Sequence, residues 1–144
     1  MVTPTTDMPK EPPSLKVVVA EDNPVNAKLI KAVLGRMGLE PVIAENGQLL
    51  LEAMREASFD LVLMDISMPV MDGYDATLAI RSGSAGTQHQ NVLIIAVTAL
   101  ETSDTLQTCI DVGMNGLLGK PISADRLRAA IERAQRGELL ESQH

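Results

Sequence analysis

Five short hydrophobic runs recur along the chain, and none of them alternates regularly with polar residues. Continuous runs of this length are typical of strands in a parallel sheet that is covered on both faces. Regular alternation would instead indicate a sheet with one face in water. The predicted strands are residues 16–20, 41–44, 61–64, 92–97 and 116–118.

Between these runs, hydrophobic residues recur three and four positions apart, which is the spacing of one face of an α-helix. Gly38 is suited to end the first helix, and Ser123 and Asp125 are suited to begin the last. The positions that mark the five predicted helices are Leu29, Ile30, Val33, Leu34 and Met37; Leu50, Ala53, Met54 and Ala57; a weakly marked start near Tyr74; Leu106, Cys109 and Ile110; and Leu127, Ala130, Ile131 and Ala134.

Five strands that alternate with five helices predict a doubly wound α/β domain of the flavodoxin-like, three-layer kind, with strand order 2-1-3-4-5. In this order the first and third strands are neighbours, and such folds bind ligands in the crevice at the carboxyl ends of those strands. The polar loop 83–91 lies at the opposite edge of the sheet. We therefore expect no catalytic role for this loop, and we expect its His89 to be a surface residue.

The length of 144 residues suits one domain, which we place at residues 15–136. Residues 1–14 are rich in threonine and proline and have little to bury, so they indicate a flexible leader or linker. Residues 137–144 form a short, mostly polar C-terminal tail.

The composition limits the classes of function. The net charge of -7 repels nucleic acid phosphates, so we expect no direct binding of DNA or RNA. Cys109 is the only cysteine, which excludes an internal disulfide and a multi-cysteine zinc site. No hydrophobic run is long enough to span a bilayer. We expect a soluble, cytoplasmic protein with an aliphatic core.

Charged and hydroxyl side chains stand where the predicted strands end. Glu21 and Asp22 follow the first strand, and Asp65 follows the third. Thr98 follows the fourth strand, and Lys120 follows the fifth. Each has an ordinary explanation when taken alone, such as an acidic pair at a helix start or a solvated lysine. Because the carboxyl ends of parallel strands meet at one edge, the combination predicts a single site.

Three clustered carboxylates repel each other, so either one is protonated or a cation lies among them. Oxygen ligands from neighbouring strand ends suit Mg²⁺, which also binds phosphate oxygens. Asp65 beside such an ion is a candidate nucleophile that would form an acyl phosphate. Lys120 would stabilise charge on the phosphoryl oxygens, and the Thr98 hydroxyl would donate a hydrogen bond to one of them.

Four segments that surround these residues resemble the receiver domain of two-component response regulators. They are residues 20–26, 60–73, 96–99 and 119–121, in the order and at the strand ends that the family requires. The resemblance extends from about residue 16 to residue 136. It is greatest to receivers of hybrid histidine kinases and phosphorelays.

The resemblance implies a role for each site residue. Asp65 matches the phosphoacceptor. Asp22 matches the direct Mg²⁺ ligand, Glu21 the acid that acts on Mg²⁺ through water, and the carbonyl of Ser67 the backbone Mg²⁺ ligand. The family more often has aspartate at position 21, and glutamate still suits an outer-sphere role.

The same resemblance gives Thr98 and Lys120 contacts with the phosphoryl oxygens. The donor would be a phosphohistidine of a histidine kinase or a histidine phosphotransfer protein. After transfer, the surface of the fourth helix, last strand and fifth helix would change, and an unknown partner would bind it. Leu117 replaces an aromatic residue that in this family moves inward on phosphorylation. We expect a monomer or weak dimer, with no direct membrane partner.

Several alternatives stay open at this point. The chain could be a stand-alone regulator or a receiver of a hybrid kinase. It could also be a phosphatase that forms an aspartyl phosphate, although such enzymes need an acid at the position of Ser67. A binding-only module is the third alternative, and the intact acid pair together with Asp65, Thr98 and Lys120 argues against it. We further expect Ser67 and Leu100 to flank the path of water that attacks the phosphoryl group.

Overall fold

The computed structural model describes residues 15–99 and 101–137 and contains a five-stranded parallel sheet in the order β2-β1-β3-β4-β5. The predicted strand order is therefore confirmed. The expected leader, Leu100 and the tail beyond Gly137 lie outside the described residues. The strands are β1 (Val17–Ala20), β2 (Val42–Ala44), β3 (Leu61–Asp65), β4 (Leu93–Thr98) and β5 (Gly116–Gly119).

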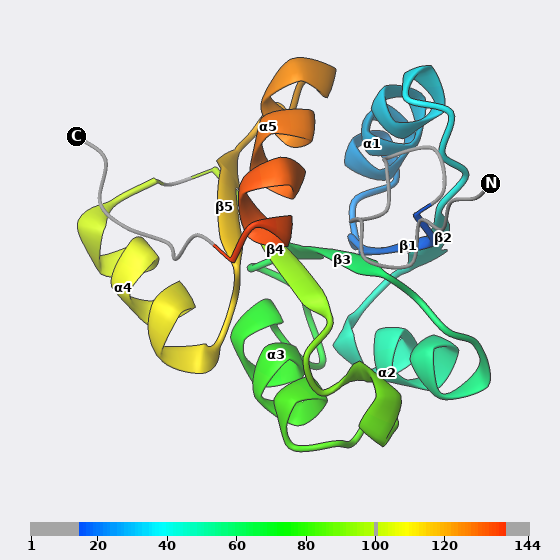
Figure 1. Ribbon diagram of the computed structural model, residues 1–144, viewed down its shortest axis with the longest axis vertical. Helices are drawn as coiled ribbons and strands as arrows, with labels where there is room; N and C mark the ends of the chain where they lie inside the picture. The colour runs from blue at the N-terminus through cyan, green and yellow to red at the C-terminus, as the bar shows by residue number, and fades with distance from the viewer. Residues whose placement is uncertain (1–14, 100, 138–144) are drawn as a thin grey trace, which may run out of the picture.

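Helices cover both faces of the sheet, as predicted for a three-layer fold (Figure 1). Helices α1 and α5 lie on one face, and α2, α3 and α4 lie on the other. The helices are α1 (Pro24–Arg36), α2 (Gly47–Glu56), α3 (Gly73–Arg81), α4 (Ser103–Val112) and α5 (Ala124–Gln135).

The continuous hydrophobic runs are explained by burial on both faces. Side chains of a strand alternate between the two faces of its sheet. In β1, Val17 and Val19 pack in the cluster beneath α1 and α5, whereas Val18 and Ala20 pack in the cluster beneath the other three helices. All four are at most 2% exposed. The sheet therefore divides the hydrophobic core into two separate halves.

Local signals fix the helix boundaries. A side-chain oxygen accepts a backbone N–H at the start of each of the five α-helices, which satisfies donors that have no partner within the helix. Gly38 has a φ of 81°, as expected for the glycine that ends the first helical pattern. The capping residues are Asn23, Asn46, Asp72, Thr102 and Ser123.

The surface position expected for His89 is wrong. The α3–β4 connection folds into the short 3-10 helix η2 (Thr87–His89), and His89 is only 1% exposed. Its Nε2 accepts from the Phe59 N–H at 3.0 Å, and its Nδ1 lies 2.9 Å from the Ala85 carbonyl oxygen. Since Nε2 is the acceptor, Nδ1 carries the proton and donates to Ala85. The imidazole joins two loops at the amino-terminal edge of the sheet, far from the acidic residues.

Candidate functional site

The strand register brings the predicted site residues to one edge of the sheet. Ala20 of β1 is paired with Met64 of β3, so Glu21 and Asp65 each come one position later. Asp65 is itself paired with Val97 of β4, and Thr98 with Gly119 of β5. Asp65 and Thr98 are thus the last residues of their strands, one position beyond the predicted strand ends.

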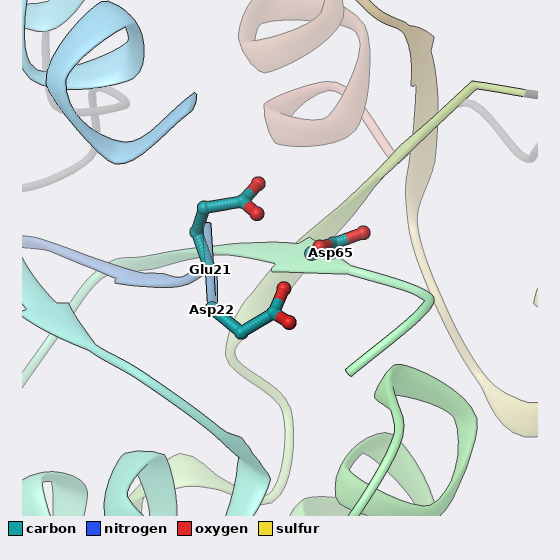
Figure 2. Close-up of side chains that lie close together, drawn as sticks. All are labelled: Glu21, Asp22 and Asp65. Carbon is teal, nitrogen blue, oxygen red and sulfur yellow. The ribbon is translucent and has the colours of Figure 1, made fainter. Parts of the chain in front are cut away.

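Three carboxylates converge at this edge. Figure 2 shows Glu21 and Asp22 extending from the end of β1 toward Asp65 at the end of β3. One carboxylate oxygen from each of the three residues lies within 4.8 Å of the other two. Glu21 and Asp65 are buried, whereas Asp22 is exposed. Such a set of hard oxygen donors, open to solvent on one side, fits Mg²⁺, which retains several of its waters.

Lys120 supplies the positive charge of the site. Its Nζ lies 3.4 Å from Glu21 Oε1 and 3.4 Å from Asp65 Oδ1. Its backbone N–H donates to the Thr98 carbonyl at 2.7 Å. The peptide bond from Lys120 to Pro121 is cis. The lysine therefore bridges the two buried acids while its backbone holds β5 against the end of β4.

The negative charge of the Glu21 carboxylate is only partly compensated by neighbouring groups. Its Oε2 accepts from the Asn23 N–H at 3.2 Å, but the buried Oε1 has no hydrogen-bond partner and only the 3.4 Å ion pair with Lys120. Burial raises the pKa of this carboxyl, and the charge of Asp65 raises it further. The Asn23 hydrogen bond and Lys120 oppose that shift. A buried oxygen without a hydrogen-bond donor fits a water held by a cation, as expected for Glu21.

The loop after β3 folds back over the site. The Ser67 N–H donates to Asp65 Oδ1 at 3.2 Å, and the Gly73 N–H donates to the Ile66 carbonyl at 2.9 Å. A Cβ on Gly73 would lie 2.6 Å from the Asp65 carbonyl oxygen, so α3 begins in direct backbone contact with the strand that carries Asp65. The steric need for glycine depends on a contact across the loop.

The tip of this loop contains a backbone outlier. Val70 has a φ of 71° and is 82% exposed. The left-handed region is costly for a β-branched residue, which glycine or asparagine would avoid. The outlier lies five positions after Asp65, within the segment that covers the carboxylates.

Thr98 is 8% exposed at the end of β4. Leu117, which stands where the family has an aromatic ring, is half-buried and packs against the core cluster that also contacts Tyr74. Leu100, expected beside the water path, lies outside the described residues.

A mainly apolar hollow of about 260 Å³ adjoins the site on the α1 side of the sheet. Lys120 forms one wall of it, and the acidic cluster lies outside its lining. The lining residues are Asn26, Leu29, Ile30, Val97, Lys120, Pro121 and Ile122.

Comparison with known proteins agrees with this geometry. The chain is 38% identical over 116 residues to the sensor protein GacS of Pseudomonas syringae pv. syringae. That alignment covers 81% of this chain and 13% of GacS. It is 36% identical over 124 residues to hybrid signal transduction histidine kinase A of Dictyostelium discoideum. That alignment covers 84% of this chain and 6% of the kinase. The chain thus spans only a small part of these relatives.

Solved structures show the same fold. The receiver domain of the sensor histidine kinase PA1611 from Pseudomonas aeruginosa, crystallised with magnesium in its active-site cleft, is 32% identical with a TM-score of 0.75. That match covers 85% of this chain and 98% of the PA1611 domain. The chemotaxis protein CheY4 of Vibrio cholerae is 28% identical with a TM-score of 0.76, over 83% of this chain and 98% of CheY4.

Among the described residues, no helix is both long enough and apolar enough to cross a membrane.

The family model described as "response regulator receiver domain" matches residues 17–132. This match covers most of the chain and confirms the resemblance that the four sequence segments indicated. The chain therefore belongs to the response regulator receiver domain family.

Proposed function

We propose that Asp65 accepts a phosphoryl group from a phosphohistidine and that this event changes a surface bound by a partner. The observation that carries the proposal is the position of Lys120 Nζ, 3.4 Å from both Asp65 and Glu21, beside the convergent carboxylates. A buried nucleophilic carboxylate next to one lysine and a cation site is suited to capture phosphorus.

The reaction depends on a divalent cation in this proposal. Asp22, Asp65 and the Ser67 carbonyl would hold Mg²⁺ directly, and Glu21 would hold it through water. The donor set and the magnesium in the PA1611 receiver support this assignment. When bound, the ion supplies positive charge to the phosphoryl oxygens.

The remaining chemistry falls to the chain itself. An Asp65 carboxylate oxygen attacks phosphorus, the new O–P bond forms, and the P–N bond to the donor imidazole breaks. The imidazole keeps the electron pair of that bond and leaves as a neutral ring once it holds one proton. Lys120 offsets the charge on the phosphoryl oxygens, and the Thr98 hydroxyl donates to one of them. Water later attacks the phosphorus of the acyl phosphate, the O–P bond to Asp65 breaks, and inorganic phosphate and the Asp65 carboxylate are released.

The chain would catalyse only its own phosphorylation and dephosphorylation. Aspartyl-phosphate phosphatases need a general acid two positions after the nucleophile, and here that residue is the exposed Ser67. The serine backbone N–H donates to Asp65, so it orients the carboxylate and supplies no proton to a leaving group.

The similarity to hybrid kinases favours a histidine kinase or a histidine phosphotransfer protein as the donor. We propose that residues 15–136 form the receiver domain and work in the cytoplasm as a monomer or weak dimer. The changed surface would consist of α4, β5 and α5, which follow Thr98 in the chain. The partner that binds this surface is a protein and not a nucleic acid.

Acetyl phosphate with Mg²⁺ tests the proposal. The intact mass should rise by one phosphoryl group, and the gain should disappear with EDTA and in Asp65→Asn. Hydrolysis of p-nitrophenyl phosphate should stay far below one turnover per chain in the same period. An unchanged mass would favour the binding-only module, and many turnovers would favour the phosphatase.

A further inference from the structure

A charged contact crosses the end of β5, next to the proposed phosphorylation site. Glu101 follows β4 by three residues, and its Oε2 lies 3.6 Å from a terminal guanidinium nitrogen of Arg126 in the first turn of α5. A Cβ on Gly119 would overlap the Glu101 carboxylate. The missing side chain at position 119 therefore provides the space in which Glu101 reaches α5.

This contact links Glu101, between Thr98 and α4 in the sequence, to α5. At one end, the Thr98 carbonyl accepts from the Lys120 N–H at 2.7 Å. At the other end, Thr102 caps α4 through the Thr105 N–H at 3.1 Å. Glu101 lies between these two points and pairs with a different helix. Thr98 is thus bonded to the end of β5, and Glu101 contacts the start of α5.

A phosphoryl group on Asp65 would place new acceptor oxygens beside the end of β4. Thr98 ends the strand next to Asp65, and in the proposed function its hydroxyl moves toward the group to donate to it. The residues that follow Thr98 are displaced with it. Such a movement draws Glu101 away from Arg126, because Arg126 is held in α5, where its backbone N–H donates to Ser123.

We propose that Glu101 and Arg126 are positioning residues that hold the β4–α4 segment in its unphosphorylated arrangement and so oppose phosphorylation of Asp65. This inference rests on the proposed function. The ion pair exists only in the unphosphorylated arrangement. Its free energy therefore shifts the equilibrium away from the phosphorylated arrangement. Both side chains are about half exposed, at 51% and 49%. Exposed ion pairs are weak, so loss of this pair should change the affinity for a phosphoryl analogue by only about 1.5- to five-fold.

The test uses beryllofluoride, an analogue of the phosphoryl group, in the presence of Mg²⁺. Its apparent dissociation constant is measured from amide resonances of the ¹⁵N-labelled protein. Glu101→Gln and Arg126→Gln should each bind about 1.5- to five-fold more tightly than the wild type, and the double variant should gain nothing more. Gly119→Ala should act in the same direction, because its methyl group displaces the flexible carboxylate without a change of charge.

Two controls separate this role from a general effect of charge or stability. Arg128→Gln removes an equal charge from the exposed face of α5, away from Glu101, and should leave the constant unchanged. The exchange Glu101→Arg with Arg126→Glu should restore the wild-type constant. The gain in beryllofluoride affinity of the single variants should also become smaller at high salt.

Unchanged or weaker binding in both single variants would overturn the inference, as would additive gains in the double variant. Those results would leave the proposed function intact if the wild type still binds beryllofluoride and Asp65→Asn does not. A wild type that binds no beryllofluoride would instead reject the proposed function together with this inference.

Discussion

At the scale of single residues, the site gathers charge that the fold only partly neutralises. Glu21 and Asp65 are buried beside one lysine, and one oxygen of Glu21 has no hydrogen-bond donor. A buried carboxylate of this kind destabilises the folded chain whenever it is charged. The site is therefore organised for a ligand more than for stability.

Glu21 gives a prediction about pH. Burial raises the pKa of its carboxyl above the ordinary 4.5, so the folded chain retains this proton at a pH where the unfolded chain has lost it. The free energy of unfolding in EDTA should therefore decrease as the pH rises from 4.5 through the raised pKa. Urea unfolding at several pH values measures this slope. Glu21→Gln should flatten it, and an equal slope in both proteins would contradict the assignment.

Val70 gives a prediction about strain. A left-handed backbone costs an L-residue roughly 1–2 kcal/mol, and asparagine tolerates it better than a β-branched side chain. Val70→Asn should thus raise the free energy of unfolding by about 1 kcal/mol in urea. Val25→Asn is the matched control, because Val25 is also highly exposed at 75% but lies in α1, where φ is negative. A similar gain in both variants would exclude relief of strain.

At the scale of helices and strands, the contact between β3 and α3 positions Asp65, the proposed nucleophile. Gly73 begins α3 against the Asp65 carbonyl, and the Ile66 carbonyl accepts its N–H. The path from Asp65 to α3 therefore runs through backbone atoms, which cannot be displaced as easily as side chains.

Gly73→Ala tests this contact. The added methyl group would lie 2.6 Å from the Asp65 carbonyl oxygen and 2.9 Å from Ile66 Cα. We expect a loss of about 2–3 kcal/mol in the free energy of unfolding and slower phosphorylation by acetyl phosphate. Gly35→Ala is the control, since no atom lies within 4 Å of its added methyl group, and it should be neutral or stabilising. A loss of similar size in the control would contradict this reason.

The sequence predicted the elements well because most of the strands are buried on both faces and the helices have capping residues. It did not predict contacts that depend on how loops meet. His89 stands among polar residues, so nothing in the local pattern indicated its burial. Arg81 likewise donates to the Gly113 and Val92 carbonyls across the amino-terminal edge, a role that no local pattern in the sequence indicates. The meeting of Glu21, Asp22, Asp65 and Lys120 at one edge was predictable because each one ends a strand or follows its end within two residues.

At the scale of the whole molecule, ligand binding should be visible as stability. A ligand that binds only the folded chain raises the free energy of unfolding by RT ln(1 + [L]/Kd), which is about 2.7 kcal/mol at one hundred times Kd. Mg²⁺ should therefore raise the midpoint of thermal unfolding of the wild type. Asp22→Asn removes a proposed direct ligand and should abolish most of this increase. An equal increase in both proteins would place the bound ion elsewhere.

The site is assembled from four separate chain segments that meet only in the parallel sheet. Asp65 lies on β3, whereas Lys120 arrives with β5, the last strand in the sequence. Under the proposed function, a chain still emerging from the ribosome would accept phosphate poorly until residue 120 has been made and β5 has joined the sheet. A phosphoryl group on Asp65 would consequently mark a chain whose sheet has formed as far as its fifth strand.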